Sequence, residues 1–235
     1  VCWGLFVLPE SLPKDKRVPF RWKNANPLGA LKLLRSHPML AGLSRSFFLV
    51  SLAHVVLPST AVLYMYYRFG WDSRAVGVFL AGVGISSLLV QGFLVKPAVK
   101  LLKERGAIVV GLSFGAAGFA IYGLAPTGLI LWIGVPVMAV WGIATPSLQA
   151  IMTRLVDPTE QGRLQGALAS IQGMASLIGP ALFTQIFAAS ISTHSEWKLL
   201  PGAAFLASTL LVLVAMVLAW RTTQPPRLLS VTDPA

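Results

Sequence analysis

Three side chains that could contact a ligand recur at every fourth position of one apolar stretch: Trp141, Thr145 and Gln149. Residues four apart lie on the same face of a helix, so these three form a stripe that drifts slowly around it. An aromatic ring and two hydrogen-bonding groups on one face suit a large amphipathic ligand. The alternative is a seam of hydrogen bonds to a neighbouring helix. The sequence leaves both interpretations open.

Another apolar stretch contains two ionisable residues, Arg45 and His54. Such residues within a membrane span cost about 2.5–3.5 kcal/mol on insertion scales, so they are functional candidates. With an ordinary pKa of about 6.5, His54 could exchange protons or bind a substrate; otherwise it is a neutral ring bonded to another helix. Arg45 would either reach the lipid headgroups or contact an anion or acid at the inner mouth of a cavity. Nine residues make about two and a half turns, so one pocket holds both only if the helix bends at Pro58.

The chain offers few other groups for chemistry. Cys2 is the only cysteine, which excludes an internal disulfide and a cluster of thiolate ligands. The apolar stretches contain no Asp or Glu in their interiors, and no phosphate-binding glycine motif is present. We therefore expect no enzyme activity, no metal and no cofactor. Single polar groups elsewhere in the apolar stretches are expected to pack between helices: Gln91, Gln165, Ser170, Gln172, Ser176 and Gln185.

The composition indicates that these residues are positioned by membrane-spanning helices. Apolar residues make up 55% of the chain and charged residues 11%, whereas a soluble domain has roughly 25% charged residues. Six apolar runs each have about the 20 residues that cross the hydrocarbon layer as a helix. Their approximate bounds are 39–67, 74–99, 105–125, 128–152, 164–191 and 199–220. An all-helical membrane protein with six spans is predicted.

The basic residues predict the orientation of these spans. Of the nineteen Lys and Arg residues, fifteen fall in the segment before the first span, in alternate loops and in the tail. The opposite loops hold three. Because basic loops stay in the cytoplasm, we expect both the linker and the C-terminus there. The net charge of +11 is thus explained by topology, and nucleic acid is not an expected partner.

The sequence predicts four parts. Residues 1–9 are an apolar stub, too short to span, that reads as the end of a preceding transmembrane helix. Residues 10–38 form a basic cytoplasmic linker, residues 39–220 the six-helix bundle, and residues 221–235 a cytoplasmic tail. An even number of spans after such a linker suggests a transporter divided at its central loop, with an N-terminal six-helix half missing.

Three segments carry specific motifs. The longest runs from Pro146 to Ala150, then through Arg154, Asp157 and Gln161–Gly166, to Gly179–Thr184; the others are Leu8–Ser11 and Leu101–Gly106. Together they resemble the tetracycline-resistance-like branch of the major facilitator superfamily. Leu8–Ser11 is similar to the branch's signature at the start of the central linker, and Leu101–Gly106 to its second basic inter-helix motif.

The resemblance implies the C-terminal half of a major facilitator fold, whose two halves rock about a midplane cavity. It also implies proton-coupled efflux of a small amphipathic, drug-like compound, with protons and the lipid bilayer as further partners and the bacterial inner membrane as the location. The spans 39–67 and 128–152 would line the cavity, and Arg45, His54, Trp141, Thr145 and Gln149 are the candidates for its substrate and proton pathway.

Charged residues at the cytoplasmic loops are the candidates for a gate: Lys103, Arg105, Arg154, Asp157, Glu160 and Arg163. They would either brace a turn or form a latch that exchanges partners between states. One exposed ion pair contributes only about 0–1 kcal/mol, so a latch needs several pairs together. The alternative functions are a sugar or metabolite carrier, or a transport-dead membrane receptor or assembly factor.

Overall fold

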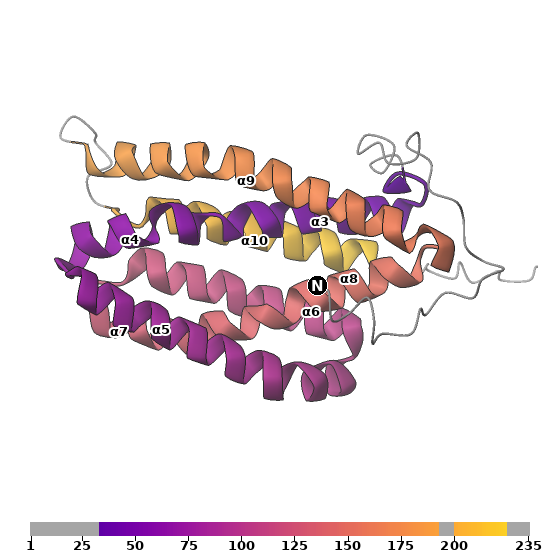
Figure 1. Ribbon diagram of the computed structural model, residues 1–235, viewed down its shortest axis with the longest axis horizontal. Helices are drawn as coiled ribbons and strands as arrows, with labels where there is room; N and C mark the ends of the chain where they lie inside the picture. The colour runs from indigo at the N-terminus through magenta and orange to yellow at the C-terminus, as the bar shows by residue number, and fades with distance from the viewer. Residues whose placement is uncertain (1–32, 193–199, 225–235) are drawn as a thin grey trace, which may run out of the picture.

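A computed structural model describes residues 33–192 and 200–224 of the chain, and all regular structure in these ranges is helical. The predicted stub 1–9, most of the linker 10–38 and residues 225–235 of the predicted tail lie outside the described residues. Figure 1 shows the helices running roughly parallel to one long axis.

The first span consists of two helices, α3 (Pro38–His54) and α4 (Val56–Phe69). Pro38 occupies the first turn of α3, where a missing N–H is tolerated, and the His37 side chain accepts a hydrogen bond from the Met39 N–H. The interruption falls at Val55 rather than at Pro58, where the sequence suggested a bend. Proline removes the hydrogen bond to the carbonyl four residues before it, so the helix is disturbed at His54 and Val55.

The second and third spans lie in one helical segment of 52 residues, Ser73–Leu124, which is interrupted at Lys103. At 1.5 Å per residue it would extend about 78 Å, far more than the hydrocarbon thickness of about 30 Å. It contains α5 (Ser73–Leu89), a π-helical stretch (Val90–Leu94) and α6 (Val95–Leu124).

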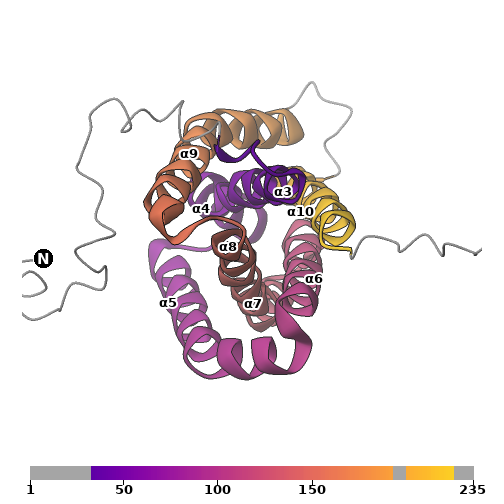
Figure 2. The ribbon, with the colours of Figure 1, turned by 90° about the vertical axis from the view of Figure 1, so that its right-hand side faces the viewer.

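The direction reverses at Lys103, whose φ of 56° is non-helical. Figure 2 shows the turns between α5 and the main length of α6 crossing one end of the bundle. The predicted spans 74–99 and 105–125 are the two arms of this segment. Among the described residues, five helical segments are long and apolar enough to span a membrane, and the reversal divides one of them into two arms.

The last three spans follow the predicted ranges closely. The fourth comprises α7 (Gly128–Val140), a 3-10 turn (Trp141–Ile143) and α8 (Ala144–Arg154). After a short 3-10 turn (Pro158–Glu160), α9 spans Gln161–Ile191, and α10 spans Ala203–Thr222. The start of α3 and the end of α10 lie at the same end of the bundle (Figure 1).

Small residues set the close packing at the centre. Helix α10 packs along both α3 and α6, and α6 also packs against α7 and α8. A Cβ on Gly111 would lie 2.8 Å from the Ala144 backbone nitrogen, and one on Gly115 would lie 2.6 Å from the Trp141 ring. Glycine at these two positions of α6 therefore allows the fourth span to approach it closely.

Helix α5 has little cover within the chain. Only 6% of the most apolar window of Ser73–Leu124 is buried. Leu88 is 72% exposed and Leu177 on α9 is 81% exposed. Figure 2 shows α9 and α5 at the upper and lower edges of the left side of the bundle. This apolar surface requires lipid or further protein to cover it.

Candidate binding cavity

A cavity of about 850 Å³ lies between the first, second, fourth and fifth spans. This volume falls within the range of about 300–1,000 Å³ that is typical of small-molecule sites. Much of its wall is apolar, with Val50, Val83 and Met138 among the contributors. Its polar and aromatic side chains are Ser51, His54, Ser87, Gln91, Trp141, Thr145, Gln149, Gln172 and Ser176. Such a wall suits a molecule that is largely apolar and has several hydrogen-bonding groups.

Three prolines disturb the helices at the level of this cavity. Because a proline cannot bond to the carbonyl four residues before it, Pro58, Pro146 and Pro180 remove the usual partners of His54, Gly142 and Ser176. All three of these residues line the cavity. Gly142 has no side chain, so its contribution to the wall is backbone, and a Cβ there would meet nothing within 4 Å. The cavity wall thus includes backbone as well as side chains.

His54 and Trp141 form an aromatic pair across two spans. Their ring centroids are 5.4 Å apart, and the planes are inclined at 44°. Phe119 of α6 also packs against Trp141, and the two ring centroids are 5.1 Å apart. The Trp141 ring is buried, and its Nε1 makes no hydrogen bond within the described parts of the chain. The pair holds the His54 imidazole at the cavity wall beside the fourth span.

The stripe of Trp141, Thr145 and Gln149 faces this cavity. Among the described residues, neither the Thr145 hydroxyl nor the Gln149 carboxamide makes a hydrogen bond to another helix. Both side chains are half-buried at the cavity wall, so they remain available to a ligand or to water. This arrangement favours the ligand-binding interpretation over an interhelix seam.

Some polar residues lie at the cavity although the sequence suggested otherwise. Gln91, Gln172 and Ser176 were expected to pack between helices, but they line the cavity, and Ser51 and Ser87 were not singled out. The sequence did contain a signal that these residues share a face with a common role. Ser87 and Gln91, and likewise Gln172 and Ser176, are four residues apart, the same spacing as Thr145 and Gln149.

Arg45 lies outside the cavity wall. Its side chain is exposed, and its Nε donates to the Ala41 carbonyl at 3.3 Å, one turn earlier in α3. The interruption at Val55 therefore does not bring Arg45 and His54 into one pocket. Nor do Gln165, Ser170 and Gln185 belong to the wall.

The six gate candidates gather at the end of the bundle where α8 meets α6 and α9. Arg154, at the end of α8, makes an ion pair with Glu104 of α6 at 2.6 Å. Lys103 is the turn residue of the reversal. The guanidinium of Arg105 lies 4.2 Å from the centre of the Trp220 ring of α10, a cation–π contact. These contacts tie α6 to both α8 and α10.

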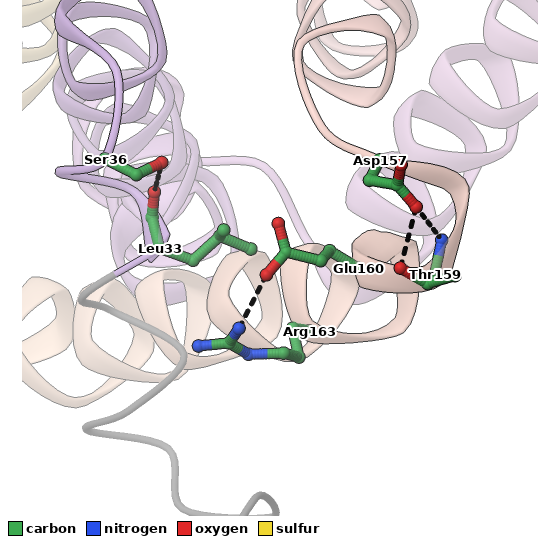
Figure 3. A network of polar contacts seen from close by, with 6 residues as sticks. All are labelled: Leu33, Ser36, Asp157, Thr159, Glu160 and Arg163. Carbon is green, nitrogen blue, oxygen red and sulfur yellow. Dashed lines mark hydrogen bonds and ion pairs between the residues drawn. The ribbon is translucent and has the colours of Figure 1, made fainter. Parts of the chain in front are cut away.

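The remaining candidates brace the corner between α8 and α9 (Figure 3). Asp157 accepts hydrogen bonds from the backbone N–H and the hydroxyl of Thr159, at 2.9 Å and 2.7 Å. Glu160 pairs with Arg163 at 2.6 Å, three residues apart. The expected bracing role fits these local contacts, whereas the Glu104–Arg154 pair joins two spans.

Known proteins share this sequence pattern. The tetracycline resistance protein, class C, of Escherichia coli is 35% identical over 204 residues, covering 86% of this chain and 50% of that protein. The human Hippocampus abundant transcript 1 protein is 29% identical over 206 residues, covering 86% of this chain and 41% of its own length. The chain thus spans about half the length, or less, of these curated relatives.

A solved structure shares the fold. The crystal structure of the human organic anion transporter MFSD10 (TETRAN) matches with a TM-score of 0.73 at 22% identity, covering 90% of this chain and 52% of that one.

The described residues form an all-helical bundle of membrane spans with the fold of this solved structure. The sequence model of the Major Facilitator Superfamily matches residues 1–180. The chain belongs to this superfamily, and it is an integral membrane protein.

Proposed function

We propose that this chain is the C-terminal half of a secondary transporter that exports a small amphipathic, drug-like compound in exchange for protons. The observation that carries the proposal is the cavity of about 850 Å³, in which the His54–Trp141 pair and the Thr145–Gln149 stripe meet. The 35% identity to a tetracycline resistance protein supports a drug-like substrate.

The proposal includes a second six-helix half that completes the cavity. The exposed apolar faces of α5 and α9 and the half-length coverage of the relatives support it. The basic loops favour a cytoplasmic location for both the linker and the C-terminus, and we assign the protein to a bacterial inner membrane. Protons, a small molecule and the bilayer are then its partners.

Two other functions remain as alternatives. A facilitator-family carrier of a sugar or metabolite would use the same carboxamides and hydroxyls to bind hydroxyl groups. A transport-dead receptor or assembly factor would keep the fold and the cavity but show no flux. The aromatic pair and the mostly apolar wall favour an amphipathic drug-like compound over a sugar.

The decisive experiment is efflux of a panel of compounds, including tetracycline and simple sugars, by the complete transporter in cells with and without an uncoupler. Export of an amphipathic compound that stops with the uncoupler supports the proposal. Uncoupler-resistant sugar flux favours the carrier, and the absence of any flux favours the receptor.

Two substitutions connect the flux to the cavity. Gln149→Leu should raise the KM for the exported compound about tenfold, since a hydrogen bond to the substrate is lost. Gln185→Leu on α9, outside the cavity, is the matched control and should leave KM unchanged.

His54→Ala tests the proton pathway. If His54 exchanges the coupled proton, the variant should lose uncoupler-sensitive efflux while still binding the compound. An unchanged dependence of efflux on pH would rule out this role for His54.

A further inference from the structure

A second, smaller cavity of about 220 Å³ lies beside the large one. Its walls come from α4, α5 and α7, with Tyr122 of α6 and Phe205 of α10 behind them. Leu57, Val83 and Met138 line both cavities. The two spaces are therefore neighbours that share one wall, and we call the smaller one the side pocket.

The side pocket has an open side and a closed side. Tyr64, Tyr122 and Phe205 are 1%, 4% and 1% exposed, so they form its buried inner wall. Val62 and Leu80 are 37% and 48% exposed and lie at its outer border, on α4 and α5. The side pocket is thus enclosed by α4, α6 and α10 on its inner side and more exposed where α4 and α5 form its border.

Size and polarity restrict what the side pocket can hold. An apolar cavity of about 150 Å³ in another protein stays dry and binds benzene. At about 220 Å³ the side pocket has room for a phenyl ring or a short branched alkyl group. Apart from two tyrosines, its lining residues are apolar, so a charged or strongly polar group would lose hydration without compensation.

One polar atom at the inner wall has no partner. The Tyr64 hydroxyl donates to the Tyr122 carbonyl at 2.8 Å. The Tyr122 hydroxyl is buried and makes no hydrogen bond within the described parts of the chain. A bound water needs two to four polar partners, which these walls do not offer. The inner wall therefore offers no accessible hydrogen-bonding group, which favours an apolar occupant.

We propose that the side pocket is a second subsite, which takes an apolar substituent of the transported molecule while its polar part stays in the large cavity. This rests on the proposed function only in taking the large cavity as the substrate site. The substrate class is thus a molecule with a hydrogen-bonding body and an apolar arm of about ring size.

The test is equilibrium binding of para-substituted benzamides to the purified complete transporter in detergent. The carboxamide suits the glutamines of the large cavity, and the substituent grows from methyl to butyl. Each buried methylene should tighten binding about fourfold. Ala61→Phe, which fills the side pocket from α4, should abolish this increase while the methyl compound still binds.

A second arm tests the polarity of the side pocket. Para-acetylbenzamide and para-isopropylbenzamide have nearly the same shape, but the first presents a carbonyl. The acetyl compound should bind more weakly, because its carbonyl loses hydration at a wall without an accessible donor.

The outcomes separate the subsite from the proposed function. Gln149→Leu should weaken all members of the series by one factor if the large cavity binds the carboxamide, whether or not protons are coupled. A methylene increase that persists in Ala61→Phe, or that is absent in the unmodified protein, would overturn the subsite. Absence of the increase in the unmodified protein would mean that lipid or a side chain of the other half occupies the side pocket. No binding of any benzamide would overturn it as well.

Discussion

At the scale of single residues, Tyr64 and Tyr122 show how differently two buried phenols can be placed. Both are almost completely buried. Tyr64 donates to the Tyr122 carbonyl and so joins α4 to α6, whereas the Tyr122 hydroxyl has no partner in the described residues. The same substitution at the two sites should therefore have different consequences for stability.

We predict that Tyr64→Phe lowers the free energy of unfolding by about 1 kcal/mol, since it removes a hydrogen bond between two spans. Tyr122→Phe is the matched control and should cost nothing, because its hydroxyl makes no bond to lose. Unfolding of the purified protein in detergent, followed by circular dichroism, measures both. Equal losses at the two positions would contradict the assigned hydrogen bond.

The polar residues of the cavity show what the sequence can and cannot predict at this scale. The spacing of Trp141, Thr145 and Gln149 indicated a common face, and that face lines the cavity. Gln172 and Ser176 have the same spacing, but spacing alone does not say whether a face meets a cavity or a neighbouring helix. Arg45 was a candidate because it is charged, and its position on α3 directs it elsewhere.

At the scale of elements, glycines on α6 determine how near the fourth span can lie. We predict that Gly111→Ala costs about 1–3 kcal/mol, because the added methyl group would meet the Ala144 backbone, which cannot move as a side chain can. Gly84→Ala on α5 is the control, since nothing lies within 4 Å of its added Cβ. It should be neutral or slightly stabilising.

Unfolding of the two glycine variants in detergent measures this difference. If Gly84→Ala were as harmful as Gly111→Ala, close approach to Ala144 could not be the cause, since nothing lies near the Cβ added at Gly84 and alanine has the higher helix propensity. A loss at Gly111 alone would identify the contact with α8 as its cause.

The helices themselves were largely predictable, whereas their interruptions were not. Length and apolarity were sufficient for the six spans, since only a helix satisfies its backbone in lipid. The bend of the first span appears at Val55 because Pro58 acts on the carbonyl one turn earlier. The reversal at Lys103 lies between the predicted spans 74–99 and 105–125, but its φ of 56° at a non-glycine residue was not predictable.

Two ion pairs at the charged end of the bundle differ in whether they connect separate helices. Glu104 and Arg154 join α6 to α8, while Glu160 and Arg163 lie within one turn. We predict a coupling free energy of about 0.3–1 kcal/mol between Glu104→Gln and Arg154→Gln, falling at high salt because Arg154 is exposed. The Glu160–Arg163 pair should show about 0.3–0.5 kcal/mol at most.

Double-mutant cycles at low and high salt measure both couplings. Strictly additive effects of Glu104→Gln and Arg154→Gln would show that the pair contributes nothing to holding α6 against α8. The pair could then not serve as part of a latch.

At the scale of the whole molecule, the important feature is the surface left uncovered. Helices α5 and α9 border the cavity, and they also carry strongly exposed leucines such as Leu88 and Leu177. The lining residues of the cavity include no Asp, Glu, Lys or Arg. A wall of this kind can bind a molecule and hold it in place, but it offers no carboxylate to carry protons.

We therefore predict that this chain alone, purified and placed in liposomes, does not transport any compound when a proton gradient is imposed. In the proposed function this chain forms half of the cavity, and half a cavity cannot close on both sides of the membrane in turn. The measurement is tetracycline flux into or out of the liposomes with an imposed pH difference. The complete transporter in the same liposomes is the positive control. Proton-driven flux by the chain alone would mean that six spans are sufficient, as in a symmetric dimer of this chain, and would refute the requirement for a different second half.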